Sequence, residues 1–464
     1  MSALLTSSPV NPDSPNGNAS LTEWLDYMQQ IHVTAIDMGL SRVLPVAEYL
    51  GVVQSAKDEA YVFTVAGTNG KGSTTAVISE MCQAAGYKTA LYQSPHLSCF
   101  NERVRINGEM VSDQTLIIAF TKVEIARLQC ALTLSFFEMT TLAALLIFAE
   151  ADCDVWVLEV GLGGRLDVVN IIDCDMAVIT NIGIDHVDWL GDNVEDIGAE
   201  KAGILRNNVP LIFGATDMPN SVQKIIITHS VSCYQVQRDF NYRLLDAQTW
   251  QYSNAAVTLQ LPRPALSLMN TANALSAVLA SPLNIDISAI EHALQTVTLA
   301  GRFDYRESKD RCWLFDVAHN EQGVEFLLAQ LLPLWQEHLN RQTSNVTTTV
   351  SSDNVKTARV KTSRIKMLFS MLGDKDIDKV VQRLTEAGLP ITEWFIAEID
   401  YPRAASTEQL QNILAKHVDK SCVHEFSSLS QATQAVINAS QPQDLILVCG
   451  SFHTIGEALA ALEI

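Results

Sequence analysis

The stretch YVFTVAGTNGKGSTT, residues 61–75, decides the fold of the first part of the chain. Its apolar, β-rich start breaks at Gly67, and a helix is predicted to begin near Lys71. The glycines at 67, 70 and 72 allow the backbone to approach a polyphosphate closely, while successive N–H groups and the helix N-terminus favour negative charge. Lys71 adds a full positive charge. The stretch therefore predicts a phosphate-binding loop and a bound nucleotide.

This loop departs from the strict nucleotide-binding pattern G-x-x-x-x-G-K-[ST]. Val65 stands where the first glycine of that pattern belongs, and Gly72 separates Lys71 from Ser73. A glycine-rich turn that binds nothing is the alternative interpretation. The order of strand, Gly-x-x-Gly-Lys and helix favours a variant phosphate-binding loop.

Length and composition limit the class of protein. With 464 residues the chain exceeds one ordinary core, and ~2 to 3 domains are expected. Hydrophobic residues make up 48% and charged residues 18%, which is typical of a soluble globular protein. The longest apolar segment, residues 139–149, is shorter than the ~20 residues that cross a bilayer, so no membrane span is expected.

The N-terminus and the cysteines indicate the compartment. Residues 1–20 contain neither a basic region nor an apolar core, so they are predicted to be a disordered leader rather than a secretory signal. The nine cysteines include no C-x-x-C pair, and their odd number fits a reducing compartment better than a disulfide framework. A cytoplasmic location is therefore expected.

The net charge of −21 arises from 52 acidic and 31 basic residues. The field of this charge opposes nucleic acids and anionic membranes, so neither is expected as a partner. An anionic ligand such as a nucleotide needs local positive charge and divalent cations to offset that field. The acidic balance therefore favours metal dependence.

Strand-like and helix-like segments alternate along the chain after a helical stretch predicted at residues 21–51. In the first part, strands are predicted at residues 62–66, 89–93, 155–160, 176–182 and 209–213, with helices between them at 71–85 and 194–205. This alternation predicts a parallel sheet with helices on both faces and with ligands at the carboxyl ends of the strands.

A second α/β domain is predicted after a boundary within residues 296–304. Its strands are expected at residues 313–317, 365–370, 394–399 and 445–448. The predicted organisation is thus a leader at 1–20, an ATP-binding domain at 21–298 and a C-terminal α/β domain at 299–464. Within the last domain, residues 340–363 are rich in Thr, Ser, Asn and Val without a helical period, and are expected to form an exposed insertion.

The run DVWVLEVGLGGRLD, residues 154–167, puts Glu159 at the carboxyl end of a predicted buried strand, directly before a glycine-rich turn. Mg²⁺ takes oxygen ligands, often one or two carboxylates together with substrate phosphates, so a Mg²⁺ ligand is expected at this position. A carboxylate that only stabilises the turn through local hydrogen bonds is the alternative.

Two further residues could contribute to such a site. His186 follows the next strand and is a second candidate metal ligand, although a lone histidine is more often packed or hydrogen-bonded. Lys201, in the run EKAGI at 200–204, has a helix-end charge as its ordinary role. In a desolvated site its pKa would fall, and the neutral amine could react with CO₂ to form a carbamate.

Several motifs occur along the chain in a fixed order. They are GTNGKGS (67–73), YQSPHL (92–97), NERVRING (101–108), LEVGLGGRLD (158–167), DHVDWLG (185–191), EKAGI (200–204), FDVAHN (315–320) and CGSFHT (449–454). Together they resemble the folylpolyglutamate synthases, and most closely the bifunctional bacterial dihydrofolate synthases/folylpolyglutamate synthases of the Mur ligase superfamily. The resemblance runs from about Trp24 to the C-terminus, with only the leader and residues 340–363 outside it.

That resemblance implies an α/β fold in which a P-loop-type parallel-sheet ATPase domain precedes a smaller Rossmann-like ligase domain. It also implies an ATP-dependent amide ligase that adds L-glutamate to dihydropteroate, forming dihydrofolate, and to reduced folates, forming folylpolyglutamates. The γ-phosphoryl group of ATP would convert the pterin-linked carboxylate into an acyl phosphate, which the glutamate amine attacks. Mg²⁺ is the implied metal, and a monomer is expected.

Residue roles follow from the motifs that carry the resemblance. The implied ATP-binding residues are Thr68, Asn69, Gly70, Lys71, Gly72, Ser73, Asn270 on the adenine side, Arg302 and Asp316. Ser94, Glu159 and His186 would hold Mg²⁺. Catalytic roles are implied for Lys71, for Lys201 as a carbamylated lysine, and for His319.

On the pterin side, the resemblance points to Gln30, Ile31, His32, Val33, Ser135, Phe136, Phe137, Glu138, Leu166, Asp167 and Val168. The aromatic pair at 136 and 137 suits a flat heterocycle, with ordinary core packing as the alternative. Arg42 ends the signature HVTAIDMGLSR at 32–42, yet it receives no chemical role because a helix-end salt bridge explains it equally well.

Two other functions stay open from the sequence. One is a ligase of the same superfamily that acts on a different carboxylate, such as a cell-wall peptide precursor, which the pterin-side segments argue against. The other is a nucleotide-binding switch or regulatory ATPase, which would turn over ATP without requiring glutamate.

Overall fold

The computed structural model describes residues 14–15, 18–32, 39–246, 248–346 and 364–464. The chain divides into two compact units, residues 1–297 and 298–464. The sequence placed this boundary within residues 296–304. Most of the predicted leader, and residues 347–363 of the predicted insertion, lie outside the described residues.

The first unit is built on an eight-stranded sheet with the order β4-β3-β2-β5-β1-β6-β7-β8. The strands are β1 Tyr61–Ala66, β2 Thr89–Tyr92, β3 Val104–Ile106, β4 Glu109–Met110, β5 Val155–Glu159, β6 Met176–Ile179, β7 Leu211–Phe213 and β8 Cys233–Gln235. The strands predicted from the sequence are confirmed. The predicted parallel sheet is confirmed, with an edge that the sequence did not predict: β3 pairs antiparallel with β2 and with β4, and both edge strands are too short for an apolar run to mark them.

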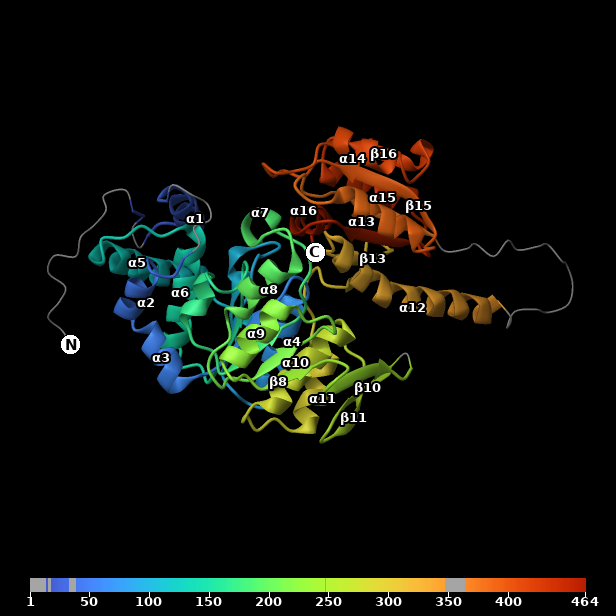
Figure 1. The fold of residues 1–464 in the computed structure, drawn as a ribbon. Helices are drawn as coiled ribbons and strands as arrows, with labels where there is room; N and C mark the ends of the chain where they lie inside the picture. Colours follow the sequence, from blue (N-terminus) through green and yellow to red (C-terminus); the bar gives the residue numbers. More distant parts are fainter. Residues whose placement is uncertain (1–13, 16–17, 33–38, 247, 347–363) are drawn as a thin grey trace, which may run out of the picture. The chain divides into compact units, whose positions relative to one another are not determined.

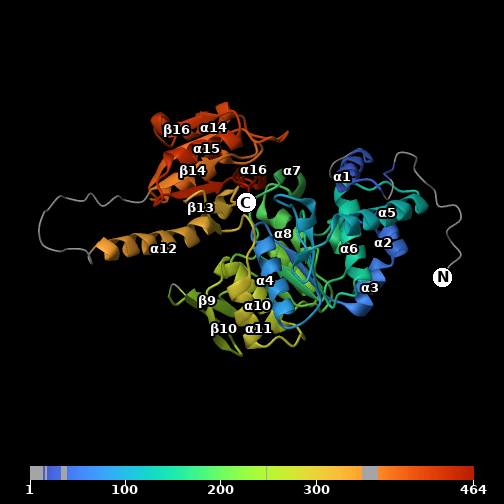
Figure 2. The same cartoon turned by 180° about the vertical axis from the view of Figure 1, so that it is seen from behind.

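Helices cover both faces of this sheet. Their bounds are α1 Leu21–Gln30, α2 Leu44–Leu50, α3 Val52–Glu59, α4 Lys71–Ala84, α5 Asp113–Gln129, α6 Phe136–Glu150, α7 Val187–Leu190, α8 Val194–Ala202, α9 Asn220–Thr228, α10 Leu268–Ala280 and α11 Ile287–Thr296, with 3-10 helices η1 Phe100–Arg103 and η2 Val168–Ile171. Helices α8 and α9 lie in front of the sheet in Figure 1, and α4 lies in front of it in Figure 2. α4 packs against β1, β2 and β5, and α10 and α11 pack against α4.

The helical stretch predicted at residues 21–51 is not continuous. α1 starts with a capping box between Ser20 and Glu23 and ends at Gln30, so Ile31 and His32 follow the helix instead of extending its apolar face. Gly51 adopts a φ of +75° and ends α2. The apolar spacing continued across these ends because α1, α2 and α3 contribute to the same core.

A buried polar cluster fixes α1 to α5. The Tyr27 hydroxyl donates to Glu124 Oε1 at 2.7 Å, and Arg127 Nη2 donates to the Tyr27 hydroxyl at 3.0 Å. Arg127 also forms an ion pair with Glu124 through Nε and Oε2 at 2.5 Å, with both side chains buried. The charges of Arg127 and Glu124 therefore balance each other. Through Tyr27, the two residues hold the end of α1, which carries part of the predicted pterin side.

A separate antiparallel sheet, which sequence reasoning missed, consists of β9 Phe240–Leu244, β10 Thr249–Asn254 and β11 Thr258–Pro262. Trp250 and Tyr252 of β10 are buried and face the same side of the strand. This two-residue alternation was available in the sequence, but polar residues between the apolar ones interrupt the run.

The second unit contains a six-stranded sheet with the order β12-β13-β17-β14-β15-β16, in which only β12 runs antiparallel to its neighbour. The strands are β12 Asp304–Ser308, β13 Arg311–Asp316, β14 Ile365–Phe369, β15 Ile391–Ala397, β16 Val423–Phe426 and β17 Leu445–Cys449. The helices are α12 Glu321–Val346, α13 Ile377–Glu386, α14 Thr407–Leu414, α15 Leu429–Ala439 and α16 Phe452–Leu462, with 3-10 helix η3 Lys420–Cys422. The predicted strands of this α/β unit are confirmed.

The start of the predicted insertion was wrong, because residues 340–346 continue α12 to Val346. Their polar composition hid the helix, since polar side chains also form a helix when an apolar segment precedes them. None of the described helices combines the length and apolar composition needed to cross a bilayer.

Candidate active site

The turn between β1 and α4 has the geometry of an anion-binding loop. β1 ends at Ala66 and α4 begins at Lys71, with Gly70 at the N-cap and no side chain capping the helix. The first N–H groups of an α-helix have no partner within the helix, so they are available to an anion. The Nζ of Lys71 donates to the carbonyl oxygen of Gly67 at 3.1 Å, which keeps its charge beside the turn.

Gly67 and Gly70 are required by conformation and by space. Their φ angles are +149° and +84°, which L side chains rarely adopt. A Cβ at Gly67 would lie 1.8 Å from Thr180 Oγ1, and a Cβ at Gly70 would lie 2.2 Å from Asn270 Oδ1. The loop therefore lies directly against the end of β6 and against α10.

Thr180 and Asn181 hold this loop in place, and sequence reasoning missed both. Asn181 accepts the N–H groups of Thr68 and Asn69, at 3.0 Å through its carbonyl oxygen and 3.1 Å through Oδ1. Thr180 Oγ1 and Asn181 Nδ2 both donate to the carbonyl oxygen of Asn69, at 2.6 and 2.8 Å. The prediction extended the strand to residue 182, whereas β6 ends at Ile179 and leaves these polar residues at the sheet edge.

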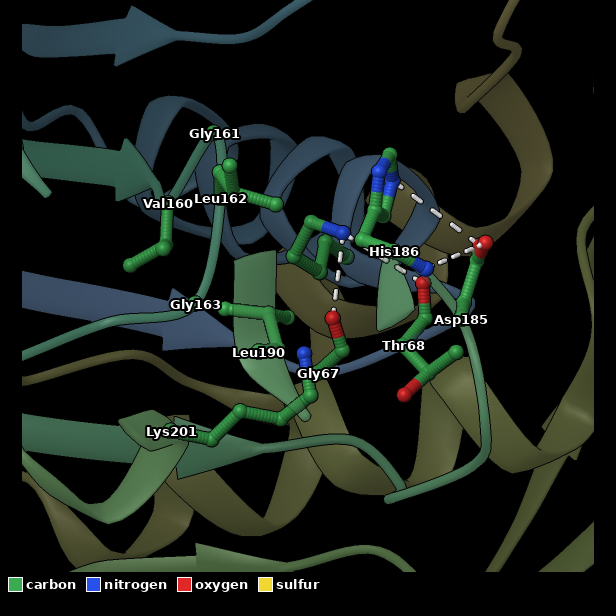
Figure 3. A pocket seen from close by; sticks show the side chains of 11 residues that line it. Gly67, Thr68, Val160, Gly161, Leu162, Gly163, Asp185, His186, Leu190 and Lys201 are labelled. Atoms are coloured by element: carbon green, nitrogen blue, oxygen red, sulfur yellow. Dashed lines mark hydrogen bonds and ion pairs between the residues drawn. The ribbon is translucent and has the colours of Figure 1, made fainter. Parts of the chain in front are cut away.

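One pocket gathers several of the predicted residues. It is lined by Gly67, Thr68, Lys71, Val160, Gly161, Leu162, Gly163, Asp185, His186, Leu190 and Lys201. Figure 3 shows the turn after β5, the phosphate loop, His186 and Lys201 around this pocket. Segments that follow β1, β5 and β6 thus meet at the carboxyl edge of the sheet, as the sequence predicted.

Lys201 enters the pocket from the end of α8 and is only 4% exposed. Burial lowers the pKa of Lys201 to about 7, Lys71 lowers it further, and Asp185 opposes the shift. Close packing positions this end of α8, because a Cβ at Gly203 would lie 2.3 Å from Arg165 Cβ. A substantial fraction of the Lys201 side chain is therefore a neutral amine at neutral pH.

The three predicted metal ligands lie at or after the carboxyl ends of three different strands. Glu159 is the last residue of β5 and is 3% exposed, and Ser94 follows the neighbouring strand β2 at the same edge. His186 lines the pocket beside Asp185, with 3.9 Å between His186 Nε2 and Asp185 Oδ2. In the part of the chain that the structure describes, no three His, Cys, Asp or Glu side chains form a group that could hold a metal.

That donor set fits a hard cation bound together with a nucleotide. Mg²⁺ commonly takes one or two protein carboxylates, several waters and phosphate oxygens, so a complete protein cage is not required. A buried carboxylate at a strand end, a hydroxyl and a nearby phosphate loop supply such donors.

Asp167 shapes the glycine-rich turn. Its Oδ2 accepts the N–H of Leu162 at 2.8 Å, and its Oδ1 accepts the N–H of Val169 at 2.9 Å. Burial raises the pKa of Asp167 to about 6, while these backbone donors and Lys71 oppose the shift. Leu166 and Val168 flank it, so this part of the predicted pterin side holds the turn that lines the pocket.

The other two pterin-side segments meet through Arg42. Arg42 Nη2 donates to Glu138 Oε1 at 2.5 Å, and its Nη1 lies 3.2 Å from His32 Nε2. Ser135 and Glu138 also form the capping box at the start of α6. Gln30 ends α1, Ile31 follows it, and Val33 lies outside the described residues. Arg42, which received no role from the sequence, therefore joins the two segments.

Phe136 and Phe137 are packed but not fully buried. A Cβ at Gly161 would lie 2.4 Å from the Phe137 ring, and the Phe136 ring meets Phe100 edge-on with centroids 6.2 Å apart. Core packing thus accounts for only part of their surface, and the remainder is accessible.

The remaining residues predicted to bind ATP lie on α10 and in the second unit. Asn270, on α10, is 5% exposed, and its Oδ1 accepts no hydrogen bond from the described residues. In the second unit, Asp316 accepts the N–H groups of Phe303 and Ala318, both at 2.9 Å. Burial raises the pKa of Asp316, and Arg302 opposes that shift.

His319 and Arg302 have defined neighbours within the second unit. His319 Nδ1 donates to the carbonyl oxygen of Val317 at 2.8 Å, since a carbonyl can only accept, and this fixes the hydrogen on Nδ1. The Arg302 guanidinium carbon lies 4.8 Å from the centroid of the Phe452 ring.

Comparison with known proteins places this geometry in a family. Residues 65–281 match the Mur ligase middle domain, and residues 351–452 match the Mur ligase glutamate ligase domain. A dihydrofolate synthase/folylpolyglutamate synthase from Escherichia coli K12 is 37% identical over 97% of both chains.

Solved structures agree over the full length. An E. coli FolC structure in complex with DHPP and ADP has a TM-score of 0.84 and 36% identity, covering 97% of this chain and 99% of that one. A bifunctional folylpolyglutamate synthase/dihydrofolate synthase with Mn, AMPPNP and L-glutamate bound has a TM-score of 0.83 and 34% identity, covering 97% of this chain and all of that one.

The fold and the site are those of the Mur ligases, and within them the chain belongs to the bifunctional dihydrofolate synthase/folylpolyglutamate synthase family. It is an ATP-dependent glutamate ligase with dihydrofolate synthase and folylpolyglutamate synthase activity.

Adding one methyl group at Gly70 should separate crowding from backbone strain. Gly70→Ala and the control Gly86→Ala introduce a side chain at φ angles of +84° and +90°, but Gly86 has open space around its Cβ position. Backbone strain should lower the free energy of unfolding by about 1 kcal/mol in both variants, and Gly70→Ala should lose more because Asn270 is displaced. Only Gly70→Ala should weaken nucleotide binding, by about 10-fold or more, in a fluorescent-nucleotide titration, because its Cβ displaces Asn270. Equal affinities would show that the close approach is not needed.

Proposed function

We propose that the pocket at the carboxyl edge of the first unit's sheet binds the phosphates of ATP and activates a pterin-linked carboxylate for coupling to L-glutamate. The observation that carries this proposal is the meeting of the phosphate loop, Lys71, His186 and Lys201 around one pocket. The carboxylates are those of dihydropteroate and of reduced folates, and the family membership supports both.

Phosphate binding follows from the loop itself. Residues Thr68 to Ser73 present the uncapped N-terminus of α4, and Lys71 Nζ donates to the carbonyl oxygens of Gly67 and Thr68, at 3.1 and 3.4 Å. A phosphate oxygen offers the ammonium group a charge-assisted hydrogen bond, which is stronger than a bond to a neutral carbonyl. Asn270 would face the adenine side with its unsatisfied Oδ1.

The chemistry requires activation because an amine does not displace oxide from a carboxylate. An acceptor carboxylate oxygen attacks the γ-phosphorus of ATP and ADP leaves, which gives an acyl phosphate. The neutral amine of L-glutamate then attacks the acyl carbon, phosphate leaves, and the nitrogen gives up one proton. Positioning and neutralisation of phosphoryl charge supply most of the acceleration in such transfers, and Lys71 provides positive charge at that place.

Ser94, Glu159 and His186 are proposed to hold Mg²⁺. A related structure contains Mn together with AMPPNP, which supports a divalent cation at a nucleotide site. When bound, such an ion neutralises charge on the phosphate oxygens. Glu159 supplies the anionic ligand from the end of β5, and the buried position keeps water from competing for it.

Lys201 is proposed to carry a carbamate. Its depressed pKa keeps part of the amine neutral, and a neutral amine attacks CO₂ while losing one proton. The product replaces a second cation near Lys71 with an anion, so the repulsion that lowers the pKa of Lys201 becomes an attraction. An anion at this place would also strengthen cation binding beside the phosphate loop.

The remaining assignments belong to the same proposal. In the second unit, ATP binding is proposed for Arg302 and Asp316 and a catalytic role for His319. The segments joined by Arg42 would form the pterin side. We expect a cytoplasmic monomer that uses ATP, L-glutamate, dihydropteroate and reduced folates.

ADP release should depend on both co-substrates. With Mg²⁺ and ATP present, the purified protein should release ADP only when L-glutamate and either dihydropteroate or tetrahydrofolate are added. The acyl phosphate forms on the pterin-linked carboxylate, and the amine of L-glutamate consumes it so that turnover continues. A coupled assay for ADP measures this. Equal turnover without any pterin would identify a regulatory ATPase, and turnover with a peptide precursor alone would identify another ligase.

The carbamate on Lys201 has a spectroscopic signature. In ¹³C-bicarbonate, the protein should show a carbamate carbon signal by NMR that grows between pH 6 and pH 8, because the neutral amine fraction rises through the pKa of about 7. Lys201→Arg should abolish that signal and the ligase activity while keeping the fold by circular dichroism. A wild-type spectrum without the signal, or a fully active Lys201→Arg variant, would contradict the assignment.

A further inference from the structure

Arg103 is a buried cation that lacks an anionic partner. It ends η1 at the start of β3, and its residue exposure is 9%. Its Nε donates to His96 Nδ1 at 2.9 Å and its side chain also hydrogen-bonds Tyr92, but within the described residues it forms no ion pair with a carboxylate. Arg127, the other arginine buried to this degree in the described residues, is paired with Glu124.

The nearest carboxylate in sequence does not neutralise Arg103. Glu102 accepts the backbone N–H groups of Leu97, Ser98 and Cys99, at 2.8, 2.7 and 2.9 Å, so its oxygens are committed to the loop before η1. Burial lowers the pKa of Arg103, whereas Tyr92, Glu102 and Glu159 raise it. A guanidinium stays protonated in proteins, so the charge persists without a paired carboxylate. Burying such a charge is costly unless a ligand completes it.

Aromatic rings border this guanidinium. Its central carbon lies 5.3 Å from the centroid of Phe100 and 5.9 Å from that of Phe136. Aromatic faces stabilise a cation without consuming its N–H donors. The planar fork of Arg103 is therefore held in place, and its five N–H donors exceed what His96 and Tyr92 accept, so donors remain for a carboxylate.

The position of Arg103 indicates which carboxylate it meets. Phe136 belongs to the segment proposed for the pterin side, and Glu159, whose charge acts on Arg103, ends β5 at the proposed metal site. A molecule with a flat ring at one end and an acid at the other would place its ring near Phe136 and its acid toward Glu159. The acid is then the group that must reach the γ-phosphate.

We propose that Arg103 binds the carboxylate of the pterin-linked acceptor and positions it for phosphorylation. This inference rests on the proposed function, and it adds a residue that recognises the acid group of the substrate. Two carboxylate sources share this chemistry, the acceptor and L-glutamate. The location beside Phe136 favours the acceptor, and the experiment separates the two.

A ligand pair tests the contact directly. Binding of pteroate and of an otherwise identical analogue that lacks the carboxyl group is measured by calorimetry for the wild type, Arg103→Met and Arg105→Met. Arg105, two residues along the chain, forms a hydrogen bond only to the carbonyl oxygen of Glu102 among the described residues, and its loss changes the net charge equally. The wild type and Arg105→Met should prefer pteroate by about 10-fold or more.

In Arg103→Met that preference should fall below about 2-fold, while the affinity for the analogue without the carboxyl group stays unchanged. An undiminished preference in Arg103→Met would overturn the inference and leave the proposed function intact. Equal weakening of both ligands would overturn it in favour of a structural role. A wild type that binds neither ligand would contradict the proposed function as well.

Steady-state kinetics separate the two carboxylate sources. Arg103→Lys, which retains the charge but not the planar fork, should raise the KM for dihydropteroate by about 10-fold and leave the KM values for ATP and L-glutamate within about 2-fold. A rise confined to the KM for L-glutamate would overturn the assignment to the acceptor. Urea unfolding midpoints within error of the wild type show that each variant is folded.

Discussion

The close approach of the phosphate loop to the end of β6 and to α10 is the constraint on which the site depends. Gly67 touches Thr180 and Gly70 touches Asn270 at distances that leave no room for a Cβ. Thr180 and Asn181 accept or donate four hydrogen bonds with the backbone of Thr68 and Asn69. The loop is therefore rigid before a nucleotide arrives, and little ordering entropy remains to oppose phosphate binding. The variant sequence, with Val65 in place of a glycine, is compatible with this geometry because β1 simply continues to Ala66.

Two lysines line the pocket although the whole chain is strongly acidic. The chain carries −21 overall, yet Lys71 and Lys201 line the same pocket and Arg103 lies buried under the influence of Glu159. Such local cations attract phosphates and carboxylates into a protein whose long-range field repels them. The depressed pKa of Lys201 is the result of placing two lysines near each other in a desolvated space. Functional sites often contain perturbed groups of this kind.

Sequence reasoning found the parts of the fold that apolar periodicity specifies. The buried parallel strands, the helix after Gly70 and the second α/β unit were predicted, because continuous apolar runs and glycine breaks mark them. It missed β3, β4 and the β9–β11 sheet, whose residues are polar or only alternately buried. It also merged α1 with α2, since separate helices that share one core keep a similar apolar spacing.

For the site, strand-end positions predicted Glu159 and His186, and the resemblance supplied the ligand roles that remain proposals. Contacts between distant segments could not be read from the chain, such as those of Arg42 with His32 and Glu138, or of Asn181 with the loop. The central claim is that this loop delivers a phosphoryl group to the acceptor carboxylate. The most direct measurement uses dihydropteroate with both carboxylate oxygens labelled with ¹⁸O and mass analysis of the phosphate released during turnover. One labelled oxygen in each phosphate is predicted, because amide formation breaks the acyl carbon–oxygen bond; phosphate without label would contradict the account.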